Sequence, residues 1–264
     1  MTSTQSNSKG VAVVTGSAQG IGRSIAIRLA SDGYDLVIND LESNKENLEE
    51  VKKDIAADFP ERRVLTVFGN VSIEEDVKSL IESTVKEFGR LNVFVANAGI
   101  LRSKPLLETT SDDFESVLSV NVKGTFYSYK YAAQQMVVQG EGGRIIGASS
   151  LAGKKGHASL SAYCASKFAI RGLTQTAAIE LGRNGITVNA YAPGTIDTPM
   201  LVGLAGSANY NGVYDEVIFL TMLSSVGDLG APQDISNLVS FLVTPEARFI
   251  TGQTITIDGG IFFD

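Results

Sequence analysis

The sequence has 264 residues, of which 44% are hydrophobic and 19% are charged, and its formal net charge is −7. These values fit one large α/β domain with a substantial buried core, and they exclude a mainly disordered chain. The 22 basic residues are scattered along an acidic chain, which argues against a nucleic-acid partner, and no run of about 18 apolar residues predicts a membrane span.

The single cysteine and the single histidine limit the chemistry further. Cys164 cannot form an internal disulfide, which agrees with a reducing compartment. His157 alone cannot supply a site that needs several imidazoles, and no group of cysteine, histidine and acidic residues has metal-ligand spacing. We therefore expect a soluble cytoplasmic protein that binds no metal, membrane or nucleic acid.

The predicted elements begin after a polar stretch, residues 1–9, which we expect to be a disordered tail. Apolar strands are predicted over residues 11–16, 35–40, 63–69, 91–99, 143–150, 186–194 and 254–260. Helices are predicted between them, over residues 20–32, 44–59, 73–88, 111–138, 161–182 and 232–243. Because strands that are apolar on both faces alternate with helices, we predict a seven-stranded parallel sheet with helices on both faces. No linker interrupts residues 10–264, which indicates a single doubly wound Rossmann domain.

A long polar segment with several glycines, residues 198–225, follows the sixth predicted strand. A segment of this kind beside a cleft can close over a substrate and exclude water. We therefore expect residues 198–225 to form a substrate lid.

The stretch TGSAQGIG, residues 15–22, lies at the first strand-to-helix turn. Gly16, Gly20 and Gly22 permit a sharp turn and let the backbone approach a pyrophosphate, which the unpaired N–H groups at the helix start would bind. Gln19 and Ile21 belong to the same turn. The turn therefore predicts a dinucleotide-binding site.

The ends of the next three strands supply further cofactor contacts. Asp40 ends the second strand, 18 residues past Gly22, where a carboxylate accepts hydrogen bonds from the ribose hydroxyls and repels a 2′-phosphate. We therefore expect NAD rather than NADP. Asn70 and Val71 follow the third strand, and Asn97, Ala98 and Gly99 follow the fourth.

The stretch SAYCASK, residues 161–167, places Tyr163 and Lys167 one helical turn apart on one face. An ammonium beside a phenol favours the phenolate and should lower the tyrosine pKa. Cys164 points about 100° away around the helix, so we expect it to be a packing residue. Ser150 ends the fifth strand and Asn121 lies in the long helix over 111–138.

Six motifs, in this order and spacing, resemble the short-chain dehydrogenase/reductase family over nearly the whole chain. They are TGSAQGIG, NAG, NVKG, GRIIGASS, YCASK and PGTIDTP. The resemblance implies that Tyr163 is the general acid/base and that Lys167 holds the nicotinamide ribose and lowers the tyrosine pKa. It further implies that Ser150 binds the substrate oxygen and that Asn121 orders a water linked to Lys167.

The resemblance also implies the remaining contacts. Pro193, Gly194, Ile196 and Thr198 would contact the cofactor, with Thr198 and the backbone near Ile196 orienting the carboxamide. Ser150 and Tyr163 would face the substrate. From its position directly after Ser150, we expect Leu151 to face the substrate too and to favour an apolar portion of it. His157, in the loop KKGHAS, is a candidate for the substrate mouth, with a solvated loop residue as the alternative. The family usually forms homotetramers, partly through the helices over 111–138 and 161–182 and the last strand, so we expect a homotetramer.

Within the family, the sequence looks most like the acetoin/diacetyl reductases, which are 2,3-butanediol dehydrogenases. The implied reaction is NAD-dependent hydride transfer to or from a small vicinal hydroxy-ketone or diol. A sugar or polyol dehydrogenase and a 3-oxoacyl thioester reductase are alternatives in the same family. A non-catalytic NAD-binding sensor or scaffold is an alternative of a different class.

Overall fold

The computed structural model describes residues 8–205 and 224–263. Seven strands form one sheet in the order β3-β2-β1-β4-β5-β6-β7, and all neighbouring pairs are parallel. The strands are β1 (Val11–Thr15), β2 (Asp35–Asp40), β3 (Val64–Phe68), β4 (Val93–Ala96), β5 (Gly143–Ala148), β6 (Ile186–Pro193) and β7 (Thr254–Ile257). The predicted Rossmann sheet is therefore confirmed, with β4 and β7 shorter than the sequence pattern indicated.

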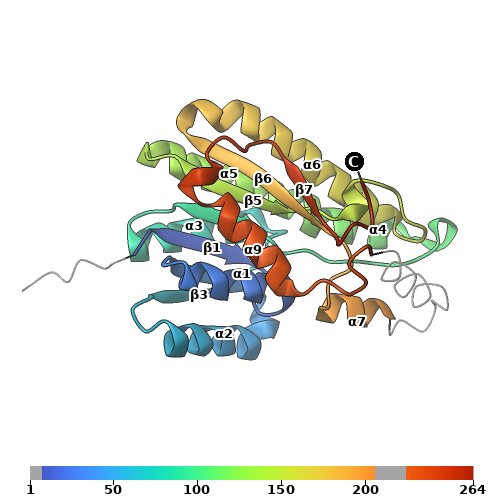
Figure 1. Cartoon of the computed structure of the whole chain (residues 1–264), viewed down its shortest axis with the longest axis horizontal. Coiled ribbons are helices and arrows are strands. Elements are labelled where there is room, and N and C mark those ends of the chain that lie inside the picture. Colours follow the sequence, from blue (N-terminus) through green and yellow to red (C-terminus); the bar gives the residue numbers. More distant parts are fainter. Residues whose placement is uncertain (1–7, 206–223, 264) are drawn as a thin grey trace, which may run out of the picture.

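The helices cover both faces of the sheet (Figure 1). They are α1 (Gly20–Ser31), α2 (Lys45–Asp58), α3 (Glu74–Phe88), α4 (Ser111–Leu118), α5 (Gly124–Gln139), α6 (Ser161–Leu181), α7 (Pro199–Ala205) and α9 (Pro232–Leu242). One buried core lies between the sheet and α1, α2 and α9, and a second lies between the sheet and α3, α5 and α6. Two cores on opposite faces explain why the strands are apolar on both sides.

The strand order reverses beside β1, which pairs with β2 on one side and with β4 on the other. In parallel sheets of this kind, a crevice opens outside the carboxyl ends of the strands at the point of reversal. The loops after β1, β2, β4 and β5 therefore converge at one edge. Most of the predicted functional residues lie at the ends of these strands, in those loops or in the elements that follow them. Asn70 and Val71 follow β3, and the predicted residues of 193–198 end or follow β6.

The long helix predicted over 111–138 differs in the structure. A π-helical turn, Ser119–Lys123, separates α4 from α5, and Asn121 is its buried residue. The wider turn leaves the Asn121 carbonyl to accept a hydrogen bond from Thr125 Oγ1 at 2.7 Å. Such turns are often found at functional sites. The sequence analysis predicted one continuous helix over 111–138 and did not show the π-helical turn, which shifts the phase of the buried face between α4 and α5.

The short helix α7 was not predicted, and it lies at the start of the segment expected to be a lid. Pro199 occupies its first position, where a missing N–H and a fixed φ angle suit a helix start. Residues 206–223 of the expected lid lie outside the described residues.

The expected tail also falls partly outside them, at residues 1–7. Ser8 and Lys9, which the sequence assigned to the tail, are hydrogen-bonded: Ser8 Oγ donates to the Gly10 carbonyl, and the Lys9 N–H donates to the Gly33 carbonyl. Within the described ranges, no helix is long and apolar enough to cross a membrane.

The core on the α1 side gives the first testable prediction. Leu36 of β2 is completely buried in it, so Leu36→Ala should lower the free energy of unfolding by about 2–5 kcal/mol through lost burial and a cavity. Leu107 is 97% exposed, so Leu107→Ala should change the free energy of unfolding by no more than about 0.5 kcal/mol. Urea denaturation of both variants measures the difference, and equal effects would contradict the assigned core.

Candidate active site

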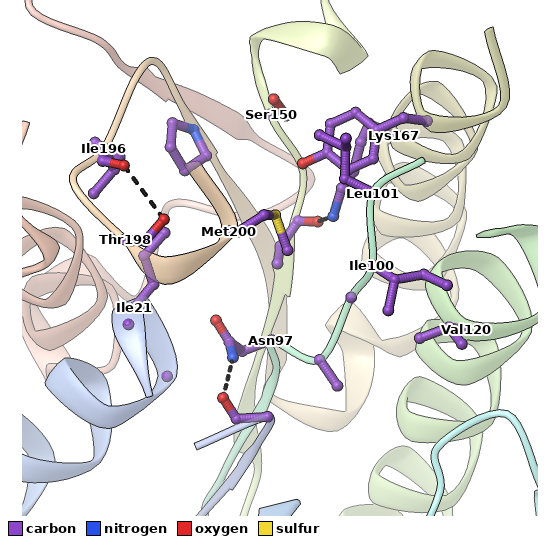
Figure 2. A pocket seen from close by; sticks show the side chains of 18 of the residues that line it. Ile21, Asn97, Ile100, Leu101, Val120, Ser150, Lys167, Ile196, Thr198 and Met200 are labelled. Carbon is purple, nitrogen blue, oxygen red and sulfur yellow. Dashed lines mark hydrogen bonds between the residues drawn. The ribbon is translucent and has the colours of Figure 1, made fainter. Parts of the chain in front are cut away.

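A cleft of about 490 Å³ opens at the carboxyl edge of the sheet (Figure 2). Its walls come from the loops that follow β1 to β6, from the start of α6 and from α7. A volume of this size is typical of a small-molecule or cofactor site.

The structure brings together all of the predicted site residues except one. Those that line the cleft are Gly16, Gln19, Gly20, Ile21, Gly22, Asp40, Asn70, Val71, Asn97, Ala98, Gly99, Ser150, Leu151, His157, Tyr163, Lys167, Pro193, Gly194, Ile196 and Thr198. The exception is Asn121, which is buried behind the wall. One cleft therefore contains both the glycine turn and the tyrosine–lysine pair.

The glycine turn has a backbone that only glycine adopts easily and packing that only glycine permits. Gly16 and Gly20 have φ angles of +64° and +55°. A Cβ atom at Gly22 would lie 2.1 Å from the Gly16 carbonyl oxygen. Helix α1 begins at Gly20, and no side-chain cap accepts hydrogen bonds from the N–H groups of its first turn. No capping side chain therefore competes with a ligand for these N–H groups. This arrangement fits the pyrophosphate of a dinucleotide.

Asn97 joins the glycine turn to the opposite side of the cleft. Its Nδ2 atom donates hydrogen bonds to the Thr15 carbonyl at 2.8 Å and the Gly16 carbonyl at 3.0 Å. Its Oδ1 atom accepts one from Tyr191 Oη at 2.8 Å. Tyr191 lines the cleft and was not predicted as a site residue. Nothing in the sequence of β6, which also contains Thr187 and Asn189, distinguished Tyr191 as a site residue.

Asp40 lies at the end of β2, as predicted, and its carboxylate holds the surrounding loops. Oδ2 accepts a hydrogen bond from the Ala18 N–H of the glycine turn at 3.0 Å. Oδ1 accepts from the Leu41 N–H at 2.8 Å and from Asn44 Nδ2 at 2.7 Å. The carboxylate therefore faces the cleft from a fixed position, where it can accept from a ribose hydroxyl and repel a phosphate.

Tyr163, Lys167 and Ser150 lie at the other end of the cleft. Lys167 is 3% exposed, its Nζ atom donates to the Ala148 carbonyl at 2.7 Å, and it lies 5.3 Å from the centre of the Tyr163 ring. Burial lowers the pKa of Lys167 to about 8. Ser150 Oγ accepts a hydrogen bond from the Ala152 N–H at 3.1 Å.

The predicted lowering of the tyrosine pKa is wrong for this structure. Burial raises the pKa of Tyr163 to about 12, and the Ser150 side chain offsets only part of that effect. The reason is that the phenol is desolvated while the Lys167 ammonium is bound to a backbone carbonyl. Tyr163 therefore holds its proton at neutral pH and is arranged as a proton donor.

Asn121 supports the cleft from behind. Its Oδ1 atom accepts from the Ile100 N–H at 2.8 Å, and its Nδ2 atom donates to the Ile100 carbonyl at 2.9 Å and to Ser166 Oγ at 3.0 Å. Asn121 thereby fixes the loop after β4 to helix α6. Cys164 is buried, as expected of a packing residue, and its Sγ atom accepts from the His157 N–H at 3.4 Å.

Several large apolar side chains of the cleft were missed by the sequence reasoning. They are Ile100, Leu101, Val120, Leu160, Met200 and Leu201. Figure 2 shows Met200 extending into the cavity between Thr198 and Leu101. These residues lie in loops, at element ends or in short helical turns, and no spacing in the sequence marked them. Among the described residues, no group of three or more His, Cys, Asp or Glu side chains could hold a metal ion.

Comparison with known proteins agrees with this geometry. A family model described as enoyl-(acyl carrier protein) reductase matches residues 16–262. A short-chain dehydrogenase/reductase of Armillaria gallica is 49% identical over 267 residues, which cover 100% of both chains. The chain belongs to the short-chain dehydrogenase/reductase family. The family resemblance that was inferred from the six sequence motifs is therefore confirmed.

Other members of the family match along nearly their whole length. The L-2,3-butanediol dehydrogenase of Corynebacterium glutamicum is 40% identical over 96% of this chain and 99% of its own. The crystal structure of levodione reductase matches with a TM-score of 0.90 and 32% identity, over 96% of this chain and 97% of its own. A short-chain dehydrogenase of Burkholderia cenocepacia, in complex with NADP, matches with a TM-score of 0.86 and 35% identity, over 97% and 99%.

The buried ammonium predicts a specific pH dependence of stability. Folded Lys167 loses its proton near pH 8, whereas an unfolded lysine keeps it up to about pH 10.4. Between these values the unfolded chain binds more protons, so stability rises with pH, by up to about 3 kcal/mol. The test measures the free energy of unfolding of the parent and of Lys167→Met from pH 7 to 10. The difference, parent minus variant, should show this rise.

Below pH 8 both states carry the proton, and the difference should be constant. Lys53 is an exposed lysine on α2, and Lys53→Met controls for the loss of one positive charge. A parent-minus-Lys167→Met difference that stays flat to pH 10 would show that the ammonium is not desolvated.

Proposed function

We propose that this family member is an NAD-dependent oxidoreductase that interconverts a secondary alcohol and a carbonyl compound. Its proposed substrate is a small vicinal hydroxy-ketone or diol, such as acetoin, diacetyl or 2,3-butanediol. The observation that carries the proposal is the position of Ser150, Tyr163 and Lys167 in the same cleft as the glycine turn. The substrate is supported by relatives named L-2,3-butanediol dehydrogenase and diacetyl reductase, at 40% and 39% identity.

The residues of the cleft fit a dinucleotide from end to end. The uncapped start of α1 would bind the pyrophosphate, and Asp40 would bind the adenosine ribose. Asn70, Val71 and Asn97–Gly99 would flank the cofactor, Lys167 would hold the nicotinamide ribose, and Pro193, Gly194, Ile196 and Thr198 would contact the nicotinamide. NAD supplies the hydride for carbonyl reduction and accepts it in alcohol oxidation.

The choice of NAD is based on Asp40. A carboxylate fixed by the Ala18 and Leu41 N–H groups would repel the 2′-phosphate of NADP. The Burkholderia cenocepacia relative binds NADP, so the family fold itself does not decide the cofactor.

The proton chemistry is assigned to Tyr163. As hydride reaches the carbonyl carbon, the C=O π bond breaks and its electron pair moves to oxygen. Tyr163 Oη donates its proton to that oxygen, and Ser150 Oγ–H stabilises the developing negative charge. This donation leaves Tyr163 as a phenolate, which the Lys167 ammonium stabilises. In the oxidative direction, the phenolate form of Tyr163 takes the hydroxyl proton of the alcohol and becomes a phenol again.

We also propose that the enzyme acts as a cytoplasmic homotetramer. Val138 on α5 and Ile179 on α6 are more than four-fifths exposed, and Phe168 on α6 is also exposed. Large apolar side chains on two neighbouring helices favour burial against another copy of the chain.

Initial rates of NADH and NADPH oxidation test the proposed function directly. The substrates are diacetyl, acetoin, a panel of ketoses and an acetoacetyl thioester, so that the sugar, polyol and thioester alternatives are measured beside the proposed one. We expect fast NADH oxidation with diacetyl or acetoin. No turnover with any carbonyl compound would favour a non-catalytic sensor.

Tyr163→Phe should lower kcat by about 10²–10⁴ because it removes only the proton donor. Binding of NADH, measured by fluorescence titration, should stay as in the parent. Tyr127 lies outside the cleft, and Tyr127→Phe should retain the parental kcat. Full turnover by Tyr163→Phe would show that another group supplies the proton.

Asp40→Asn should raise the ratio of kcat/KM for NADPH to that for NADH on the order of tenfold, because unit charges a few ångströms apart interact by about 1 kcal/mol even in water. The variant removes the charge and keeps an oxygen that can accept a hydrogen bond. Asp58→Asn, at the exposed end of α2, should leave the ratio unchanged. An unchanged ratio in Asp40→Asn would place the ribose contact elsewhere.

Light scattering of the purified protein should give a mass four times the chain mass of 28.0 kDa. Val138→Lys combined with Ile179→Lys should lower this mass, because the two charges would be buried between copies. A mass of one chain for the parent protein would refute the tetramer.

A further inference from the structure

Five of the side chains that line the cleft are large and apolar and belong to the loops and elements around Ser150, Tyr163 and Thr198. They are Leu101, Leu151, Leu160, Met200 and Leu201, which we call the apolar wall. They come from separate parts of the chain: the loop after β4, the loop after β5, the residue before α6, and α7. Their gathering at one place is therefore a property of the fold and not of one local sequence.

The apolar wall lies beside the proposed reacting groups. Leu151 directly follows Ser150, and Leu160 immediately precedes the helix that carries Tyr163. Leu101 lines the same cleft as Lys167, and Figure 2 shows Met200 extending into the cavity. A carbonyl compound bound by Ser150 and Tyr163 would have its carbon substituents against this wall.

Polar groups at this end are few among the described residues. Ser150, Tyr163, His157 and Lys167 line it, and the Lys167 ammonium already donates to the Ala148 carbonyl. Ser149 also lines the cleft, but its hydroxyl donates to the Lys167 carbonyl at 3.1 Å. The cleft's carboxylate, Asp40, ends β2, and the amides of Asn44 and Asn70 lie after β2 and β3, at the nucleotide end.

Among residues 8–205 and 224–263, this distribution can satisfy one or two substrate oxygens but not the row of hydroxyls of a polyol. Each unpartnered hydroxyl would lose its water without a replacement hydrogen bond. Hydrocarbon bound at the same place would displace water from the apolar wall. Met200 is 42% exposed, so apolar surface is present in the cleft for a ligand to cover.

Building on the function proposed above, we propose that the apolar wall binds a hydrocarbon arm, so that the enzyme prefers vicinal diketones and hydroxy-ketones with an arm longer than methyl. Diacetyl carries only methyl groups and would cover a small part of five large side chains. Each further methylene group buried against the wall should raise kcat/KM about fourfold, until the wall is covered.

A homologous series tests this proposal on the full-length enzyme. The substrates are 2,3-butanedione, 2,3-pentanedione, 2,3-hexanedione and 2,3-heptanedione, with xylulose as the polar comparison, and the readout is the initial rate of NADH and NADPH oxidation. We expect kcat/KM to rise about fourfold for each methylene group and xylulose to be the poorest substrate.

The outcomes separate the two proposals. A flat or falling series, or faster reduction of xylulose than of any diketone, overturns the apolar-arm proposal and leaves hydride transfer in place. Failure to oxidise NADH or NADPH with any carbonyl compound overturns the proposed function and the apolar-arm proposal together.

Substitutions in the apolar wall test whether it is the source of the preference for longer hydrocarbon arms. Leu101→Ser and Met200→Ser should each reduce the gain in kcat/KM per methylene group to twofold or less. Because the two substitutions lie in different parts of the chain, one still tests the proposal if the other variant does not fold. Leu107 is exposed outside the cleft, so Leu107→Ser should keep the fourfold gain. An unchanged gain in both wall variants overturns the assignment.

Discussion

The close approach of the first glycine turn to the end of β4 is the constraint on which the rest of the site depends. A Cβ atom at Gly16 would lie 2.8 Å from Ala98 Cα, and one at Gly22 would lie 2.5 Å from Asn97 Nδ2. Side chains complete the junction, because Thr15 Oγ1 accepts from the N–H groups of both Asn97 and Ala98 at 3.1 Å. The start of α1 is thereby fixed relative to the rest of the cleft.

At the opposite end of the cleft, the functional groups are held by burial and hydrogen bonds and not by close backbone packing. The Lys167 ammonium is held against the Ala148 carbonyl, and the neighbouring phenol of Tyr163 is desolvated. Asn121 ties the loop after β4 to α6 through Ile100 and Ser166. A phenol and a cation are therefore positioned before any ligand enters, and in the proposed reaction this arrangement would reduce the reorganisation that proton transfer requires.

Much of the fold and most of the site could be predicted from the sequence, because both depend on local signals. Strands that are apolar on both faces indicate a covered parallel sheet, and parallel strands bring their carboxyl ends to one edge. Residues that end those strands, such as Asp40 and Asn97, therefore had to meet. The glycine spacing gave the position of the turn.

The features that could not be predicted depend on contacts between segments that are far apart in the sequence. The link between Tyr191 and Asn97 joins residues 94 positions apart, and no pattern in either segment indicates it. The direction of the Tyr163 pKa depends on how deeply the phenol is buried, whereas helical spacing shows only that Lys167 is near. The apolar wall is assembled from four separate segments, so no single stretch of sequence contains it.

The π-helical turn at Ser119–Lys123 also sets the rotational phase between two helices. Each residue of a helix advances the side-chain direction by about 100°. Val117 of α4 and Ala132 of α5 both lie in buried positions across this turn. Removal of one residue would restore regular α-helical geometry but rotate the buried face of α5 away from the sheet. The segment therefore tolerates replacement of side chains more readily than a change in its length.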